Sequence, residues 1–343
     1  MYPRQVHPRE ENSVAWPVTL MVHVGPHKTG TTTIQAALGH NTSYLSTRGV
    51  HVPPGVHPDF GGHHLLPFLL AGRTLIPLGM RQSDVSVGDL LVQWLTDARE
   101  NAADRILVSS EAFVFVDEKA WQAFDHELRE AAALTNTVVS RIVIHFTSRE
   151  IESRLTSVAG NAYIQGATLS WEDLIEWLRV DLSRQDATIE RLPGLLTTPT
   201  EVSHIDFAYA VATPHSPAAG PTSPPEDFAQ RWFAHVLGAE EAEGMVIAQE
   251  SARLNPSLSR STLNELREFN VLNNPPHAEA VWPFAKFDGD PELERAFERL
   301  SRVRLVFMAR DTQAHLVQDL RTELAMLSEK RLRSGIRRFF RRS

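Results

Sequence analysis

The feature that most constrains this chain is a short apolar stretch that breaks at a glycine-proline turn and restarts as a helix. Residues 18–24 have the composition of a buried strand, and the chain then reads GPHKTGTTTIQAAL over residues 25–38. Apolar residues recur at helical spacing from about Thr31, so we predict that a helix begins there. A strand, a tight turn and a helix N-terminus direct backbone N–H groups at one point, and Lys28 adds a full positive charge. The pattern predicts a site for phosphate or an isoelectronic anion.

The order of residues inside this loop differs from that of a nucleoside triphosphate loop. A Walker A loop reads Gly-x-x-x-x-Gly-Lys-Ser/Thr, so that the lysine follows the second glycine. Here Lys28 precedes Gly30, and no correctly ordered Walker A run occurs elsewhere in the 343 residues. The alternative to an anion site is an ordinary Gly-Pro turn before a helix. The coincidence of strand, lysine, threonines and helix argues against that alternative.

Composition narrows the class of protein. Apolar residues make up 42% and charged residues 22% of the chain, which are globular values. The absence of cysteine excludes disulfides, thiolate metal sites and cysteine nucleophiles, and the fifteen histidines show no metal-ligand spacing, so we expect no metal. The net charge of −8 argues against general binding of nucleic acid. Because the first apolar run is too short for a signal peptide core or a membrane span, we expect a cytoplasmic protein.

Apolar runs alternate with amphipathic segments along the rest of the chain. We predict strands near residues 49–54, 105–109, 138–146 and 201–207, and helices over residues 84–100, 117–134, 150–159, 171–192 and 226–237. Strands that alternate with helices predict an α/β fold, here a three-layer sandwich around a central parallel sheet with a helical C-terminal extension. We divide the chain into an N-terminal extension (1–17), one main domain (18–329) and a basic tail (330–343).

Three charged side chains follow the ends of predicted strands: Lys28, Glu111 and Arg149. Ligands of open parallel sheets bind at the carboxyl ends of the strands, so we expect these side chains to meet in one cleft. This expectation is independent of the loop motif. The alternatives are that Glu111 caps the next helix or pairs with an arginine, and that Arg149 pairs with a surface acid such as Glu152.

Two motifs give the chain a resemblance to a known enzyme family. The run Lys-Thr-Gly-Thr-Thr after a short strand resembles the 5′-phosphosulfate loop of sulfotransferases that use 3′-phosphoadenosine 5′-phosphosulfate (PAPS). Arg149 and Ser157, eight positions apart, have the spacing at which that family binds the nucleotide 3′-phosphate. Arginine suits a phosphate dianion because its charge is permanent and its donors form a fork. Residues 109–111 resemble the acceptor-side segment of bacterial members, and weaker likenesses extend to about residue 270.

The resemblance implies that residues 18–329 form a sulfotransferase domain that moves a sulfuryl group from PAPS, as co-substrate, to a hydroxyl group. Lys28 would contact the bridging oxygen and a departing sulfuryl oxygen as a point charge. The 5′-phosphate and the sulfate would lie against backbone N–H groups and hydroxyls of the loop residues Thr29, Gly30, Thr31 and Thr32. Arg149 and Ser157 would bind the 3′-phosphate.

A base must take the proton of the acceptor hydroxyl, and two residues are candidates. Glu111 is the first, because it directly follows a predicted buried strand at the edge that faces the loop. His64 is the second, because an imidazole exchanges protons near neutral pH and the adjacent glycines allow close approach to a ligand. A loop histidine can also have a structural role or bind the acceptor, so the choice between Glu111 and His64 stays open.

The acceptor and the tail are the least constrained features. The bacterial character of the resemblance favours a carbohydrate or glycolipid acceptor, and a small-molecule hydroxyl is the alternative. From Lys330 onward there are seven basic residues and no acidic ones, with apolar residues that would share one helical face. Such a segment is typical of peripheral contact with an anionic membrane at its inner face, and a solvated disordered tail is the alternative.

Two rival functions belong to other classes. A nucleotide-dependent kinase of the P-loop type would also bind phosphate at this loop, but it needs the Walker A order and a magnesium-binding acid. A non-catalytic nucleotide-binding scaffold would keep the fold without the chemistry. The presence of both Lys28 and Arg149 disfavours the scaffold.

Overall fold

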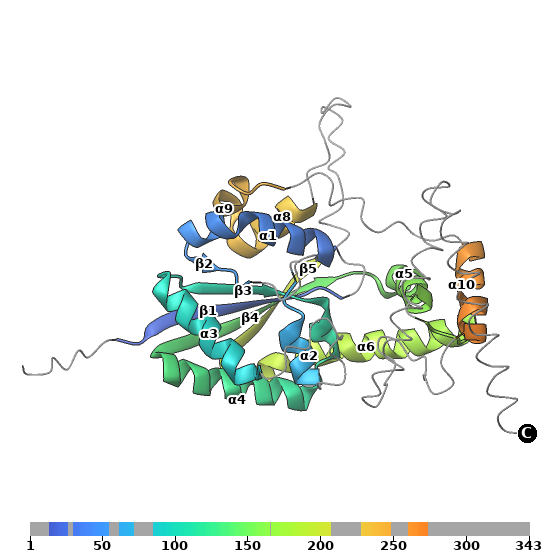
Figure 1. The fold of residues 1–343 in the computed structure, drawn as a ribbon, viewed down its shortest axis with the longest axis horizontal. Helices are drawn as coiled ribbons and strands as arrows, with labels where there is room; N and C mark the ends of the chain where they lie inside the picture. The colour runs from blue at the N-terminus through green and yellow to red at the C-terminus, as the bar shows by residue number, and fades with distance from the viewer. Residues whose placement is uncertain are drawn as a thin grey trace, which may run out of the picture.

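One sheet of five parallel strands forms the centre of the computed structural model (Figure 1). The structure describes residues 14–26, 30–54, 62–71, 85–164, 166–206, 228–247 and 260–273. The strands are β1 (Trp16–Val24), β2 (Val50–His51), β3 (Arg105–Ser109), β4 (Thr137–Ser148) and β5 (Thr200–Asp206), in the spatial order β2-β3-β1-β4-β5. Every neighbouring pair is parallel. The predicted α/β class with a central parallel sheet is confirmed.

Helices cover both faces of the sheet (Figure 1). One face carries α2 (Leu65–Ala71), α3 (Val87–Glu100), the short 3₁₀ helix η3 (Glu111–Phe115) and α4 (Glu118–Thr135). The other face carries α1 (Thr31–Thr47), α8 (Phe228–Leu237) and α9 (Ala239–Glu243). A third group, which packs together, consists of α5 (Ile151–Ile164), α6 (Trp171–Leu195) and α10 (Arg260–Asn273).

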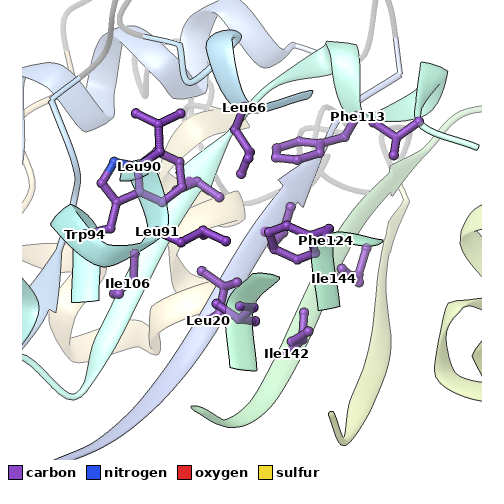
Figure 2. Packing of buried hydrophobic residues seen from close by; sticks show 14 of the residues in the cluster. Leu20, Leu66, Leu90, Leu91, Trp94, Ile106, Phe113, Phe124, Ile142 and Ile144 are labelled. Carbon is purple, nitrogen blue, oxygen red and sulfur yellow. The ribbon is translucent and has the colours of Figure 1, made fainter. Parts of the chain in front are cut away.

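The central strand β1 is buried on both faces, as expected of a parallel strand between two helical layers. Because side chains alternate across a strand, Leu20 and Val22 belong to the core under α3 and α4, whereas Met21 belongs to the core under α1 and α8. Figure 2 shows the first of these cores, in which Leu91 and Phe124 are among the helical side chains packed over the strands. His23 lies two residues after Met21, so its side chain points to the same face of the sheet, toward α1 and α8.

Side-chain caps explain why several predicted helices start where they do. Ser86 Oγ accepts a hydrogen bond from the backbone N–H of Asp89 at 3.0 Å, and the Asp89 carboxylate accepts one from the N–H of Ser86 at 3.0 Å. Asp117 caps α4 through the N–H of Ala120 at 2.8 Å. These local signals place the observed starts of α3, α4 and α6 within three residues of the predicted ones.

Some predicted bounds were wrong. β1 begins at Trp16, two residues before the predicted start, and the brief strand expected over residues 49–54 pairs with β3 only at Val50 and His51. Pro53 and Pro54 come after Val52 and cannot donate to a sheet ladder, which accounts for the early end. α5 continues to Ile164, beyond the predicted residue 159.

Several predictions lie outside the described residues. They concern residues 1–13 of the N-terminal extension, Lys28 and Thr29 of the anion loop, the weaker likenesses over residues 248–259, the C-terminal extension beyond residue 273 and the basic tail 330–343. Among the described segments, no helix combines the length and the apolar character needed to cross a bilayer.

Candidate active site

The predicted anion loop connects the end of β1 with the start of α1. Lys28 and Thr29 lie outside the described residues, but both ends of the loop are described. The Thr31 hydroxyl donates a hydrogen bond to the carbonyl oxygen of Gly25 at 3.0 Å and so joins the two ends. α1 is 17 residues long, has Gly30 at its N-cap and has no acidic residue in its first turn. The N-terminus of this helix therefore keeps the polarity that favours an anion.

Two glycines of the loop have no room for a side chain. A Cβ atom on Gly25 would collide with Thr31 Oγ1 and approach His23 Nε2 to 2.8 Å. Gly30 has φ of +81°, in the left-handed region, and a Cβ atom there would collide with the ring of Phe228. Glycine is needed at both positions because the backbone folds closely against β1 and α8. The half-buried Thr32 follows in the first turn of α1.

The two candidate bases lie next to each other at the carboxyl end of β3. Glu111 starts η3, and its Oε2 accepts a hydrogen bond from Nε2 of Gln35 at 3.0 Å. The same Oε2 lies 3.8 Å from Nδ1 of His64. Because Gln35 belongs to α1, it connects Glu111 to the helix that follows the anion loop. The rise of an α-helix places Gln35 about 7 Å along the axis from Gly30.

His64 is more buried than Glu111 and contacts Ser110. Its Nδ1 lies 2.8 Å from Oγ of Ser110, and Ser110 Oγ also accepts the backbone N–H of Ala112 at 3.1 Å. A Cβ atom on Gly62 would collide with Nε2 of the same ring, so the imidazole lies between Ser110 and Gly62. The side chain of His64 is 10% exposed and that of Glu111 is 29% exposed. Glu111 is thus the more accessible of the two candidate bases.

The neighbouring His63 has a structural role. Its Nδ1 accepts the backbone N–H of Ser109 at 3.0 Å, so its Nε2 carries the hydrogen and donates to the carbonyl oxygen of Pro53 at 2.8 Å. Burial lowers the pKa of His63 to about 4 and keeps the ring neutral. His63 fastens residues 62–64 to β3 and thereby positions His64.

A row of polar side chains crosses the sheet beneath α8. His23 of β1 is in register with Ser109 of β3 and with His145 of β4. His23 Nδ1 lies 2.8 Å from Ser109 Oγ, and its Nε2 lies 3.2 Å from Oγ1 of Thr147. The ring centroid of Trp232 is 4.6 Å from that of His23. Within the described residues, these histidines are not part of any group of three or more side chains that could hold a metal ion.

Burial keeps the two histidines of this row neutral. The pKa of His23 and that of His145 are each lowered to about 3, with burial as the larger cause. The smaller cause is the charge of a neighbouring histidine, which is His145 for His23 and His235 for His145. Both ring nitrogens of His145 are buried and have no hydrogen-bond partner in the described part of the chain.

We expect acid to destabilise the protein through these rings. An unfolded histidine binds a proton below about pH 6.5, whereas the buried rings do so only near pH 3. The free energy of unfolding should be highest above pH 6.5. It should fall as the pH drops below that value, by up to about 1.4 kcal/mol per pH unit for each ring. His145→Leu should reduce this slope and leave stability at pH 7.5 unchanged or about 1 kcal/mol higher, because it removes two unpaired buried nitrogens.

Urea unfolding followed by circular dichroism at pH 7.5, 6 and 5 measures this effect. His23→Leu is the matched control, because it removes a ring from the same row but breaks the contacts with Ser109 and Thr147. It should also reduce the slope, but it should lower stability at pH 7.5. An unchanged acid slope in His145→Leu would contradict the assignment.

The predicted 3′-phosphate residues lie around the start of α5. Arg149 directly follows β4 and is half-buried, and Ser157 is half-buried within α5. Burial and the nearby charge of Arg154 lower the pKa of Arg149. Arg154 is fully buried, and its Nη1 lies 2.8 Å and 3.0 Å from the two carboxylate oxygens of Asp186 in α6. The structure thus adds a second arginine between the two predicted residues.

Sequence reasoning did not select Gln35, Ser110, Arg154 or Asp186. Gln35 could have been noticed as a polar residue on the apolar face of α1, beside Ile34 and Leu38. The other partners give no local signal, because their contacts depend on how separate elements pack. Glu111 comes after β3 and Arg149 comes after β4, and these two strands lie on either side of β1 in the sheet. Both residues therefore follow the carboxyl ends of parallel strands, as predicted from the sequence.

No protein family model, no curated protein and no solved structure matches this chain. The motifs and the arrangement of the described side chains are therefore the basis for a functional proposal.

Proposed function

We propose that this protein is a sulfotransferase that moves a sulfuryl group from PAPS to the hydroxyl of an acceptor. The observation that carries the proposal is the hydrogen bond of Gln35 to Glu111, at 3.0 Å. This bond ties a candidate base to the helix that begins at the anion loop, whose residue order, Lys28 before Gly30, is that of a phosphosulfate loop. A proton acceptor beside an anion site is the arrangement that transfer of a charged group to a hydroxyl requires.

The loop suits a phosphosulfate for several reasons. Gly25 and Gly30 let the two ends of the loop pack closely against β1 and α8, and α1 directs its positive end toward the loop. Lys28 adds the charge that compensates the leaving oxygen. The fit does not depend on a divalent ion, because lysine, arginine and backbone N–H groups supply the positive charge.

PAPS supplies a sulfuryl group that is activated as a mixed anhydride with a 5′-phosphate. In the transfer, Glu111 accepts the proton of the acceptor hydroxyl, and Gln35 holds the carboxylate in position. The bond between sulfur and the acceptor oxygen forms while the bond between sulfur and the bridging oxygen breaks. The bridging electron pair stays with the 5′-phosphate oxygen, where Lys28 stabilises the developing charge. His64 orients the Glu111 carboxylate or the acceptor.

The acceptor is proposed to be a carbohydrate or glycolipid, on the bacterial character of the segment around Glu111. The basic tail of residues 330–343 supports a place in the cytoplasm at the inner face of a membrane, where its arginines would meet anionic lipids. A soluble small molecule with a hydroxyl group is the alternative acceptor.

Ligand-induced stabilisation tests the nucleotide class. Adenosine 3′,5′-bisphosphate without magnesium should raise the free energy of unfolding by about 2–3 kcal/mol at a hundred times Kd, because Arg149 and Ser157 engage the 3′-phosphate. The measurement is thermal unfolding at a series of ligand concentrations. Adenosine 5′-phosphate, which lacks that group, is the matched control, and ATP with magnesium tests the kinase alternative. Equal stabilisation by adenosine 5′-phosphate would contradict the assignment of Arg149 and Ser157 to the 3′-phosphate. If ATP with magnesium stabilises the protein and the bisphosphate does not, a kinase would be favoured.

A further inference from the structure

Arg154 is buried with part of its hydrogen-bonding capacity unused. Its side chain has no exposure to solvent, and its Nη1 donates to both oxygens of Asp186. Its Nε and Nη2 atoms are buried and have no hydrogen-bond partner in the described part of the chain. An unpaired donor on a buried charged group is unfavourable, because the group has lost its hydration without gaining a partner. Such a group calls for an explanation, and an anion that binds only part of the time would provide one.

The two predicted 3′-phosphate residues, Arg149 and Ser157, flank Arg154 in the chain. Arg149 lies close enough for the charge of Arg154 to lower the pKa of Arg149. Ser157 is three residues after Arg154 in α5, and residues at that spacing share one side of a helix. The other ion pair between α5 and α6, Arg179 with Glu152, is exposed. Arg154 is thus the buried member of these two pairs, and its Nε and Nη2 donors are the ones that a phosphate could use.

Asp186 is an imperfect counter-ion for Arg154. Its pKa is raised, because burial outweighs the attraction of Arg154 and the charge of Glu190 acts in the same direction as burial. The carboxylate contacts Nη1, which leaves Nη2 and Nε on the rest of the guanidinium fork. A phosphate could therefore bind the fork while Asp186 still holds Nη1.

We propose that Arg154 is a direct ligand of the nucleotide 3′-phosphate, together with Arg149 and Ser157, and that Asp186 both positions Arg154 and weakens this binding by charge competition. This inference rests on the proposed function, because it takes the 3′-phosphate of PAPS as the anion. It assigns to Asp186 the adjustment of affinity for the nucleotide, so that the product nucleotide is released more readily than it would be without the Asp186 charge.

The decisive variant is Asp186→Asn. An asparagine keeps an oxygen that accepts from Nη1 but removes the competing charge. Affinity for adenosine 3′,5′-bisphosphate should rise by about three- to tenfold, because the 3′-phosphate is no longer repelled by the Asp186 carboxylate. Affinity for adenosine 5′-phosphate, which has no 3′-phosphate, should stay unchanged. Isothermal titration calorimetry at pH 8 with both nucleotides measures the change. A merely structural ion pair predicts the opposite: Asp186→Asn would lower stability and leave the bisphosphate affinity unchanged or lower.

Arg154→Gln is the second variant, and it tests whether Arg154 itself binds the 3′-phosphate. It should weaken binding of the bisphosphate by about tenfold to a hundredfold with little effect on adenosine 5′-phosphate. Circular dichroism shows whether it folds, and if it does not, the sign of the Asp186→Asn effect decides alone. Glu152→Gln is the matched control, because it removes the exposed carboxylate between the same two helices. It should change the preference for the bisphosphate by less than Asp186→Asn does.

The outcomes separate the two proposals. If the wild-type protein does not prefer the bisphosphate over adenosine 5′-phosphate, the proposed function fails. If the wild type has this preference but Asp186→Asn does not strengthen it, the role of Arg154 and Asp186 is wrong and the proposed function stands.

Discussion

Glu111→Gln is expected to lower the rate of the proposed sulfuryl transfer by about two to four orders of magnitude. Glutamine has nearly the same shape and can still accept the hydrogen bond from Gln35, but it cannot take the proton of the acceptor hydroxyl. Affinity for the nucleotide should remain nearly unchanged, because the carboxylate is not among the proposed phosphate ligands. The rate is measured as adenosine 3′,5′-bisphosphate formed from PAPS in the presence of a carbohydrate or glycolipid acceptor, and the affinity by calorimetry.

His64→Asn is the matched comparison. The imidazole is more buried than the carboxylate and its Nδ1 already contacts Ser110, so its loss should raise the KM for the acceptor more than it lowers kcat. A loop can close over a substrate, and the ranking could then invert. If Glu111→Gln remains active while His64→Asn is inactive, the base is His64, and Glu111 only orients it.

Lys28→Ala is expected to have the second large effect, a fall in kcat of about a hundredfold to a thousandfold. The lysine charge matters most when negative charge develops on the leaving oxygen, so nucleotide binding should weaken much less than turnover. Steady-state kinetics with PAPS, together with calorimetry on adenosine 3′,5′-bisphosphate, separates the two effects.

Two further variants serve as comparison and control for Lys28→Ala. Lys28→Arg keeps the positive charge with a different donor geometry and should retain more activity than the alanine variant. Lys119→Ala removes an exposed lysine of α4 and should behave as the wild type. A Lys28→Ala protein with unchanged kcat and only a raised KM for the nucleotide would show that this lysine anchors the ground state and does not stabilise the transition state.

The sequence alone was enough for the class of fold, because the signals involved are local. Alternation of apolar strands with amphipathic helices predicts a parallel α/β sheet without any knowledge of long-range contacts. Helix starts could be predicted where a capping residue stands at the start, as Ser86 and Asp117 do. The order of the strands and the short pairing of β2 could not, because they depend on which segments meet after folding.

Some residues of the candidate site could also be predicted from local sequence patterns, whereas the contacts between them could not. Gly25, Gly30, Glu111 and Arg149 could be selected from the sequence, because each stands at a strand or helix boundary that local patterns reveal. The contact between Glu111 and His64, at 3.8 Å, joins residues 47 positions apart and depends on where residues 62–64 are fastened to β3. The sequence therefore offered the two bases only as alternatives.

The pairing of Arg154 with Asp186 was decided by tertiary structure alone. Thirty-two positions separate the two residues, and they meet because α5 and α6 pack side by side around a shared apolar core. From the sequence, Arg154 is one of the two charged residues of this helix, the other being Glu152. Burying a charge is costly, so Arg154 becomes informative once its burial and its pairing with Asp186 are known. Both properties belong to the packed chain.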